Sequence, residues 1–254
     1  MARVIAIANQ KGGVAKTTTA VNLGAALALE GRKVLVIDND PQGNATSGFG
    51  FDRSKVRKCI YDVLIGEDTI RAVREPVRAI AGLDLVPATL RLAGAEIELV
   101  GVPEREFILR KAVAEVRGEY DFILIDCPPS LGLLTLNALV AADSVLIPIQ
   151  CEYYALEGLG HLVSTIQLVQ RRLNPRLEIE GVLLTMFDGR TNLSIQVVEE
   201  VKRYFRQKVY HTIVPRNIRL SEAPSHGKPV VIYDPKCRGA EVYRELAKEV
   251  MAHG

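Results

Sequence analysis

VIAIANQKGGVAKTTTAVNLGAALALEG occupies residues 4–31. Its first part, 4–8, is a short run of Val, Ile and Ala, which predicts a buried strand. Its last part, 16–30, is an alanine- and leucine-rich run of helix length, and Gly31 stands where a glycine commonly ends a helix. The stretch therefore predicts a strand, a glycine-containing loop over 9–15 and a helix in direct succession.

The loop and the start of the helix carry residue types that bind phosphate. Backbone N–H groups at a helix N-terminus attract anions, and a lysine in such a loop reaches the β and γ oxygens of a nucleotide. We expect Lys16 to contact those oxygens, Thr17 to bind Mg²⁺ directly and Thr18 to bond an α-phosphate. The residues expected to line the phosphates are Gly12, Gly13, Val14, Ala15, Lys16, Thr17 and Thr18.

Short apolar runs and helix-length segments alternate along the rest of the chain. Further strands are expected at 33–38, 83–88, 121–126, 144–149, 180–185 and 211–215. Further helices are expected at 104–118, 132–142, 155–173, 194–208 and 239–252, and loops with short helices at 39–82. This alternation predicts an α/β fold with a mostly parallel, twisted sheet flanked by helices on both faces, and the phosphate-binding loop identifies it as a P-loop NTPase. Since no repeat or linker divides it, we expect residues 1–254 to form a single domain.

Composition excludes several classes of protein. The chain has 254 residues, of which 48% are hydrophobic and 24% charged, so it is neither disordered nor fibrous. Cys59, Cys127, Cys151 and Cys237 form no CxxC pair, which argues against a zinc site or a disulfide framework. The longest charge-free stretch, 127–142, is too short to span a membrane and contains two prolines. With no secretory signal evident either, we expect a cytoplasmic protein.

Positive charge is concentrated toward the C-terminal end. The whole chain has a formal net charge of +2, whereas residues 190–238 hold ten basic and four acidic side chains. The basic ones are Arg190, Lys202, Arg203, Arg206, Lys208, Arg216, Arg219, Lys228, Lys236 and Arg238. Such a segment fits a polyanion, and no helix-turn-helix, zinc finger or aromatic stacking platform predicts base-specific reading. We therefore expect sequence-independent contacts to nucleic-acid phosphates.

Carboxylates follow two of the expected strands. Asp38 and Asp40 lie at the end of 33–38, and Asp126 ends 121–126. At the carboxyl edge of a sheet, such a group can polarise a water molecule or complete the shell of a metal ion. We expect Asp126 to hold Mg²⁺ through water. Cys127, with no histidine nearby to act as its base, is expected to pack in the interior.

The loop departs from the ordinary pattern G-x-x-x-x-G-K-[ST], because Gln10 and Ala15 replace its glycines. Lys11 followed by two glycines makes it similar to the deviant Walker A motif, K-G-G-x-x-K-[ST], of the ParA/MinD class of P-loop ATPases. Six further stretches add to this similarity: DPQGNATSG, ATLRLAGAEIELV, DCPPSLGLLTLNAL, PIQCEYYALEGL, IEGVLLTMFDGRTNL and PRNIRLSEAPSHGKP. Over nearly its whole length the chain resembles the Soj/ParA chromosome-partitioning ATPases of bacteria.

The resemblance assigns catalytic roles to single residues. It implies that Lys11 reaches the phosphates of a partner subunit and that Asp40 orients the attacking water. Asp38 would support the metal site indirectly, through water or a neighbouring ligand. Ala15 departs from the family, in which most relatives carry glycine. If its position requires a positive φ, alanine costs about 1 kcal/mol there, with consequences for nucleotide binding, hydrolysis or dimerisation.

The resemblance also assigns the nucleotide base and the DNA contacts. Nothing in the residues alone separates ATP from GTP, whereas the resemblance implies ATP with Mg²⁺. It places Met186, Pro215 and Asn217 around the adenine. It places Arg190 and Arg219 on DNA. Further basic residues are expected to strengthen the field without direct contact roles: Lys202, Arg203, Arg206, Arg216, Lys228, Lys236 and Arg238.

The activity implied is slow ATP hydrolysis coupled to dimerisation. An ATP-bound homodimer would bind double-stranded DNA non-specifically on the nucleoid, without a membrane. A ParB/Spo0J-type centromere-binding protein would stimulate hydrolysis and release the dimer during chromosome or plasmid segregation. Control of the replication initiator DnaA is a further implication of the resemblance.

Other functions share the motif. A MinD-like membrane-associated ATPase would end in a basic amphipathic helix, whereas GAEVYRELAKEVMAHG has mixed charge and no strong apolar anchors. An ATP-dependent biosynthetic ligase, of the dethiobiotin-synthetase type, would need a dedicated substrate pocket. An iron protein of the nitrogenase type would need paired cysteines at a dimer interface. A bacterial tyrosine kinase would carry a tyrosine-rich tail, and only Tyr243 lies near this C-terminus.

Overall fold

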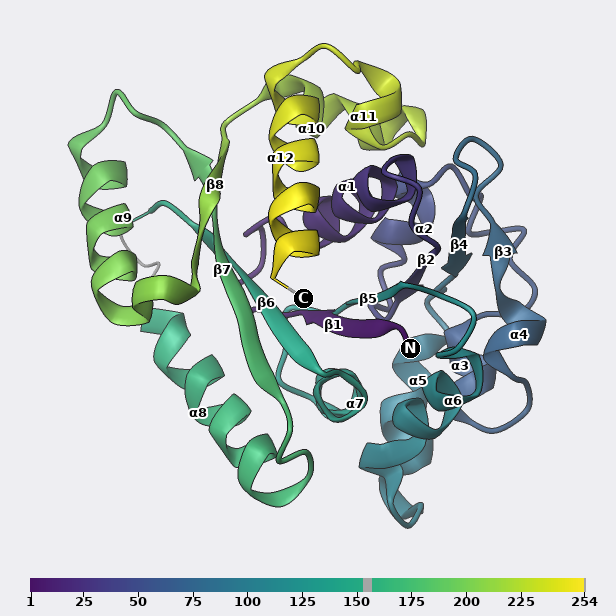
Figure 1. Ribbon diagram of the computed structural model, residues 1–254. Helices are drawn as coiled ribbons and strands as arrows, with labels where there is room; N and C mark the ends of the chain where they lie inside the picture. The colour runs from purple at the N-terminus through teal and green to yellow at the C-terminus, as the bar shows by residue number, and fades with distance from the viewer. Residues whose placement is uncertain (153–156, 254) are drawn as a thin grey trace.

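The computed structural model describes residues 1–152 and 157–253, and within them eight strands form one twisted sheet (Figure 1). The strand order is β3-β4-β2-β5-β1-β6-β7-β8, and every neighbouring pair is parallel except β3 with β4. The strands are β1 (Arg3–Ile7), β2 (Val34–Asp38), β3 (Glu75–Pro76), β4 (Leu83–Val86), β5 (Phe122–Asp126), β6 (Ser144–Gln150), β7 (Glu178–Phe187) and β8 (Val209–Pro215). The predicted α/β class and the mostly parallel sheet are confirmed.

Helices cover both faces of the sheet. The α-helices are α1 (Lys16–Leu29), α2 (Asn44–Gly48), α3 (Ile60–Leu64), α4 (Ile70–Val73), α5 (Leu92–Glu98), α6 (Ile108–Val116), α7 (Leu133–Ala141), α8 (Glu157–Arg172), α9 (Asn192–Phe205), α10 (Ile218–Glu222), α11 (Val230–Tyr233) and α12 (Arg238–Ala252). Short 3₁₀ turns are η1 (Leu99–Gly101), η2 (Arg105–Phe107), η4 (Arg206–Lys208) and η5 (Ala223–His226).

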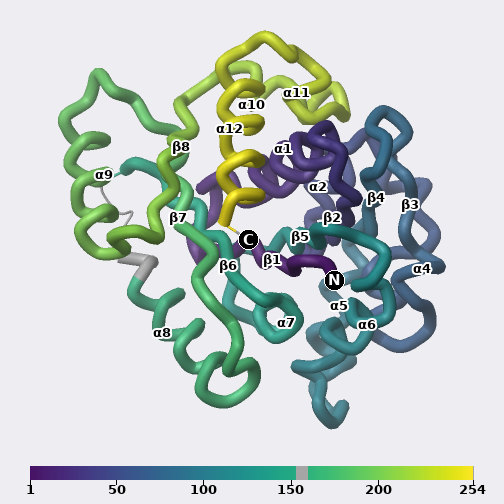
Figure 2. Tube along the Cα trace, in the orientation of Figure 1, coloured from purple at the N-terminus to yellow at the C-terminus, as the bar shows by residue number. Residues whose placement is uncertain are grey.

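Two hydrophobic cores lie on opposite faces of the sheet. Strand residues alternate between them: Val4 and Ala6 belong to one core, while Ile5 and Ile7 belong to the other. The second core is covered by α1, α10, α11 and α12, and Figure 2 shows these C-terminal helices close to α1. The first core is covered by α3 to α9. This period-two alternation explains why the strands contain almost only apolar residues.

The predicted strands and helices are all present, with differences at their ends. The helix expected from residue 104 is interrupted, because Glu104 adopts a positive φ of 54° and α6 begins only at Ile108. Likewise Arg206, with a φ of 50°, ends α9 before the expected residue 208. The start of the helix expected at 155–173 lies outside the described residues. The region 39–82 holds α2, α3 and α4, as expected, and also the two-residue strand β3.

The sheet topology brings three carboxyl strand ends together. β1 lies between β5 and β6, and β5 lies between β1 and β2. The register pairs Ile7 with Asp126, and Asp126 with Asp38. The loop that follows β1 therefore starts beside the two carboxylates that follow β5 and β2, at the edge where open α/β sheets bind ligands.

Candidate nucleotide-binding site

The loop between β1 and α1 is held in place by two polar side chains. Asn9 Oδ1 accepts a hydrogen bond from Lys11 N (3.0 Å), and Asn9 Nδ2 donates to Pro148 O (2.7 Å). Thr185 Oγ1, on β7, donates to Val14 O (3.1 Å). The loop is thus fixed to β6 and β7 before any ligand arrives. Neither anchor was predicted from the sequence, since the position of Asn9 directly after an apolar strand is the only signal.

Ala15 adopts the left-handed conformation, with φ 70° and ψ 31°, at the N-cap of α1. This position therefore does require a positive φ, and the Cβ of alanine is accommodated at a cost of about 1 kcal/mol. The carbonyl of Ala15 accepts the first helical bond, from Thr19 N (2.9 Å). The strain lies directly where the loop passes into the helix N-terminus.

Ala15→Gly is expected to raise the free energy of unfolding by about 1 kcal/mol, because glycine adopts this conformation without strain. Urea denaturation without nucleotide checks it. Ala20→Gly is the matched control: Ala20 is fully buried inside α1, where glycine lowers helix stability by about 1 kcal/mol in addition to any packing loss. Equal destabilisation by both changes would show that Ala15 is not strained.

Lys16 is a buried cation at the centre of the loop. Its side chain is only slightly exposed, and Nζ donates to Lys11 O (2.9 Å). Burial lowers the pKa of Lys16, while the nearby Asp126, Cys127 and Asp40 act in the opposite direction. The ammonium group thus lies among acidic groups at the edge where the phosphates are expected.

Asp126 is the least satisfied polar side chain of the site. It is fully buried, and neither carboxylate oxygen has a hydrogen-bond partner in the described part of the chain. Burial, and after it Asp38, raise the pKa of Asp126 well above its usual value, while the Thr17 side chain beside it lowers that pKa. Uncompensated buried carboxylate oxygens are costly, and a bound cation removes that cost.

These residues fit Mg²⁺, which prefers oxygen ligands and retains several waters. No group of three or more His, Cys, Asp or Glu side chains within 1–152 and 157–253 is arranged to hold a metal by itself. Thr17 and Asp126 would therefore hold the ion together with oxygens of a nucleotide and of water. This arrangement agrees with the ordinary chemistry of a phosphate loop.

Asp38 organises the segment that follows β2. Its Oδ2 accepts hydrogen bonds from Thr46 N (2.7 Å) and Thr46 Oγ1 (2.6 Å), and its Oδ1 accepts from Asp40 N (3.3 Å). Burial raises the pKa of Asp38 to about 6, although the bonds from Thr46 oppose this. Since both oxygens are engaged, Asp38 positions the backbone of 38–46. Thr46, which was not predicted from the sequence, extends the network to Ala88 N (2.9 Å).

Asp40 is nearly buried and close to the loop. Its Oδ1 accepts a hydrogen bond from Gln42 N (2.9 Å), which sets the direction of the carboxylate. Its charge contributes to the pKa shifts of both Lys16 and Asp126, so the three groups share one electrostatic environment. A water molecule near Nζ of Lys16, where the phosphates are expected, would lie within the electrostatic field of the Asp40 carboxylate.

A cavity of about 420 Å³ adjoins the loop. Ala15 and Thr18, beside the phosphate loop, line this cavity, and Met186, Pro215 and Asn217 line it as well. The three residues expected around the adenine are thus brought together. Met186 has a positive φ of 51°, and such strain is common at binding sites. Asn217 Oδ1 caps α10 by accepting from Arg219 N (2.9 Å) and Leu220 N (3.3 Å).

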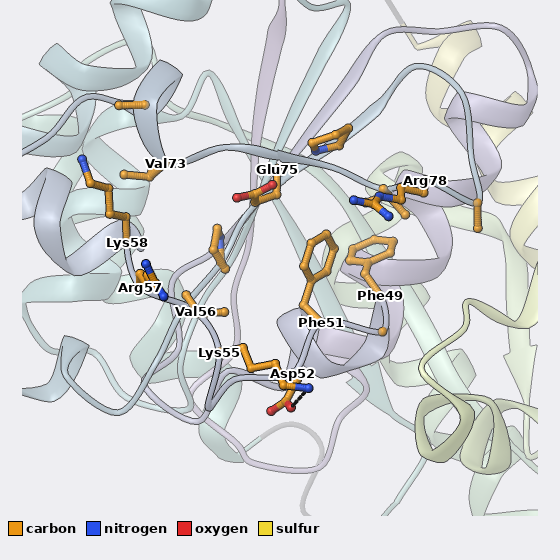
Figure 3. Close-up of a pocket in the computed structure, with 16 residues that line it drawn as sticks. Phe49, Phe51, Asp52, Lys55, Val56, Arg57, Lys58, Val73, Glu75 and Arg78 are labelled. Atoms are coloured by element: carbon orange, nitrogen blue, oxygen red, sulfur yellow. Dashed lines mark ion pairs between the residues drawn. The ribbon is translucent and has the colours of Figure 1, made fainter.

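A larger hollow of about 740 Å³ lies between segments 49–58 and 72–79 (Figure 3). Phe49, Phe51 and Arg78 lie on one side of it. None of the predicted phosphate, adenine or metal residues lines it. The smaller cavity is therefore the one that continues the phosphate site.

Both arginines expected to contact DNA are exposed and ion-paired. Arg190 makes two bonds to Asp188 (Nε–Oδ1 2.9 Å, Nη2–Oδ2 2.7 Å). Arg219 pairs with Glu222 (2.8 Å) and Asp234 (3.2 Å). Exposed pairs of this kind contribute little to stability, so a phosphate can replace the carboxylate partner.

Sequence comparison identifies the family. A family model described as an AAA domain matches residues 2–179. The chain is 62% identical over 255 residues to the sporulation initiation inhibitor protein Soj of Bacillus subtilis, covering 100% of both chains. It is 57% identical to the chromosome partitioning protein ParA of Myxococcus xanthus, covering 98% of this chain and 88% of that one. The chain belongs to the Soj/ParA family of chromosome-partitioning ATPases. ATP hydrolysis and chromosome partitioning are thus the activity and process of its family.

A solved structure supports the same fold for this Soj/ParA chain. The protein named cobyrinic acid a,c-diamide synthase from Mycobacterium smegmatis, with bound ADP and magnesium, superposes with a TM-score of 0.87 at 41% identity. The match covers 100% of this chain and 95% of that one. That name points to a biosynthetic enzyme, but the identity to the partitioning proteins is higher over the full length.

Proposed function

We propose that residues 1–254 form one ATPase domain that acts as a dimerisation switch in chromosome or plasmid segregation. ATP and Mg²⁺ bind at the phosphate loop, and two ATP-bound copies pair. The dimer binds DNA non-specifically, and hydrolysis stimulated by a ParB-type partner releases it. The observation that carries this proposal is that buried Lys16, Asp126 and Asp40 meet at the carboxyl edge of the sheet, where the Asp126 oxygens have no hydrogen-bond partner among the described residues.

The chemistry follows from these positions. Lys16 and the backbone of the loop neutralise the β and γ phosphates, while Thr17 would hold the ion directly and Asp126 through water. Mg²⁺, when bound, withdraws charge from the phosphate oxygens. Asp40 orients and polarises the attacking water, while Asp38 and Thr46 keep its backbone in place. Met186, Pro215 and Asn217 receive the adenine in the adjoining cavity. The solved relative with bound ADP and magnesium supports both ligands.

Lys11 is the residue proposed to reach the partner copy. Its side chain is about one-third exposed and lies 3.9 Å from Glu152, a weak surface contact. Lys11 can therefore exchange Glu152 for a phosphate presented by a second copy. Its backbone stays fixed meanwhile, because Asn9 and Lys16 both bond to it.

The DNA surface is proposed to lie on the basic segment 190–238. Arg190 follows the carboxyl end of β7 and Arg219 follows that of β8, and because these are neighbouring parallel strands both arginines lie at the same edge of the sheet. Two copies in a dimer would double the positive charge that the segment presents to DNA. Contacts to phosphates made by lysine and arginine give salt-sensitive, sequence-independent binding.

A backbone contact links the segment after Asp40 to the segment that carries Arg219. Gly50 follows α2, Gly227 follows η5, and both have positive φ. A Cβ on Gly50 would lie 2.8 Å from Gly227 O, and one on Gly227 would lie 2.6 Å from Gly50 Cα. Only two glycines can pack this closely. The contact supports a route by which nucleotide occupancy changes the position of the DNA-binding residues.

Arg219→Glu is expected to dimerise normally with ATP yet fail to retard non-specific duplex DNA at low salt. The change reverses one charge of the proposed DNA surface, at a residue that is not among those lining the nucleotide cavity. Gel retardation with ATP measures it. Arg219→Ala, which does not place a new carboxylate beside Glu222 and Asp234, should weaken binding less. Arg110→Glu, exposed on α6, is the control, and unchanged retardation by Arg219→Glu would remove this residue from the DNA surface.

We propose that the protein acts in the cytoplasm, on the nucleoid, and that control of DnaA is a second function. Among the helices of the described part of the chain, none combines the length and hydropathy that a bilayer crossing requires. A MinD-like amphipathic membrane helix is disfavoured by α12, whose Val242, Leu246 and Val250 are buried in the core. ATPase activity that DNA stimulates and that needs no metabolite would support the dimerisation switch and argue against a biosynthetic ligase.

Burial disfavours both an iron protein and a tyrosine kinase. Cys127 and Cys151 are buried, and burial raises the pKa of both thiols, as expected for packed side chains. They are not available on the surface to share a metal cluster with a second copy. Tyr243, the candidate for a phosphorylated tail, is fully buried and bonds to Thr19 (3.2 Å).

A further inference from the structure

Asn39 lies between Asp38, the last residue of β2, and Asp40, and it is fully buried. We propose that Asn39 is a positioning residue for hydrolysis: it sets the place of Asp40 relative to the segment after Asp126. This inference rests on the proposed role of Asp40 as the residue that orients water. It concerns a residue to which the sequence pattern assigned no role.

Asn39 spans the gap between two segments that both border the phosphates. Its backbone N–H donates to Asp126 O (3.0 Å), which fixes it to the end of β5. Its Nδ2 donates to Leu134 O (2.9 Å), in the first turn of α7. The residue therefore attaches the backbone next to Asp40 to both the strand end and the helix that follows it. A shift of α7 would be transmitted directly to Asp40.

The side-chain oxygen of Asn39, Oδ1, argues against a purely structural role for this residue. Asn39 Oδ1 is buried and has no hydrogen-bond partner in the described part of the chain. A buried unsatisfied acceptor costs about 1–3 kcal/mol, and an apolar side chain of the same shape removes that cost. Leucine would lose the bond to Leu134 O but would remove this cost, so the two effects offset and the protein should be about as stable with leucine at this position. The presence of asparagine at a position where its own Oδ1 costs stability is explained if the site requires the single directed bond from its side chain to α7.

Asn174 provides a matched comparison at the other end of α7. It is also a buried asparagine, and its Nδ2 lies within hydrogen-bond distance of Leu139 O (3.1 Å), Val140 O (3.3 Å) and Ala142 O (2.8 Å). These contacts satisfy the end of the helix, far along the chain from the phosphate loop. Asn174 therefore has the properties of a structural asparagine, whereas Asn39 does not.

The experiment compares Asn39→Leu with Asn174→Leu in the full chain. For each protein, steady-state phosphate release gives kcat and KM for ATP with Mg²⁺, and urea denaturation gives the unfolding midpoint. Asn39→Leu is expected to lower kcat at least tenfold, with KM changed less than twofold and the midpoint equal or higher. Asn174→Leu is expected to lower the midpoint and leave kcat and KM unchanged.

Two results would overturn the inference: a wild-type kcat in Asn39→Leu, or a lowered midpoint with kcat and KM altered together. Asp40→Ala, measured in parallel, separates this failure from failure of the proposed function. If Asp40→Ala is inactive while Asn39→Leu has wild-type kcat, only the role of Asn39 is wrong. If Asp40→Ala itself has wild-type kcat, the proposed role of Asp40 is wrong and the inference falls with it.

Discussion

Lys16→Ala is expected to abolish measurable ATP binding. Lys16 is the buried cation of the loop, and Asp126 and Asp40 lie near it. Its removal leaves the phosphates of a bound nucleotide facing these carboxylates without a compensating charge. Breaking a buried ion pair costs about 3–5 kcal/mol, equivalent to about 10²- to 10⁴-fold in affinity. Isothermal titration calorimetry with ATP and Mg²⁺ measures the loss directly.

Lys248→Ala is the control for this experiment, because Lys248 is an exposed lysine on α12. It should bind ATP as the wild-type protein does. A circular dichroism spectrum of Lys16→Ala should also match the wild type, since within the described residues Nζ makes a single hydrogen bond, to Lys11 O. Retention of wild-type ATP affinity in a folded Lys16→Ala protein would contradict the assignment of the phosphate site.

Asp40→Ala is expected to bind ATP and dimerise but to hydrolyse ATP about 10²- to 10⁴-fold more slowly, the usual contribution of a positioned acid–base group. The carboxylate is close to the loop and is oriented by Gln42 N, while Lys16 and Thr17 remain intact. The protein should therefore accumulate as the ATP-bound dimer. Phosphate release and size exclusion with ATP provide the two measurements.

Asp52→Ala is the matched control, because Asp52 is an exposed aspartate in the segment that follows the same strand. Its ATPase rate should equal that of the wild-type protein. If Asp40→Ala instead hydrolyses ATP at the wild-type rate, another group orients the water and the assignment of Asp40 is wrong.

The fold could be predicted from the sequence because its signals are local and strong. Apolar runs such as 122–125 and the alanine-rich helix after Lys16 favour an arrangement in which helices cover both faces of the sheet. Strand β3 could not be predicted, because it has two residues, one of them Pro76, and depends on pairing with β4. The helix ends at Glu104 and Arg206 were missed because neither residue favours a positive φ.

The candidate site could be predicted in part, for a related reason. The motif places Lys16 and Thr17 at the loop by connectivity alone, and the ends of the apolar strands indicate the aspartates, which a parallel sheet brings to the same edge. The anchors Asn9, Asn39, Thr46 and Thr185 bond to groups far along the chain, so no sequence pattern reveals them. From the sequence, strain at Ala15 could be predicted only if the position requires a positive φ. The backbone geometry shows that it does, because Ala15 is left-handed.

The proposed coupling of ATP, pairing and DNA binding can be tested in a single experiment, size exclusion with light scattering in ATP against ADP and with or without duplex DNA. We expect a monomer with ADP, a dimer with ATP, and co-elution of DNA with the dimer alone. DNA that co-elutes equally in ADP and in ATP, or a protein that stays monomeric with ATP, would show that the nucleotide does not control pairing and DNA binding in this way.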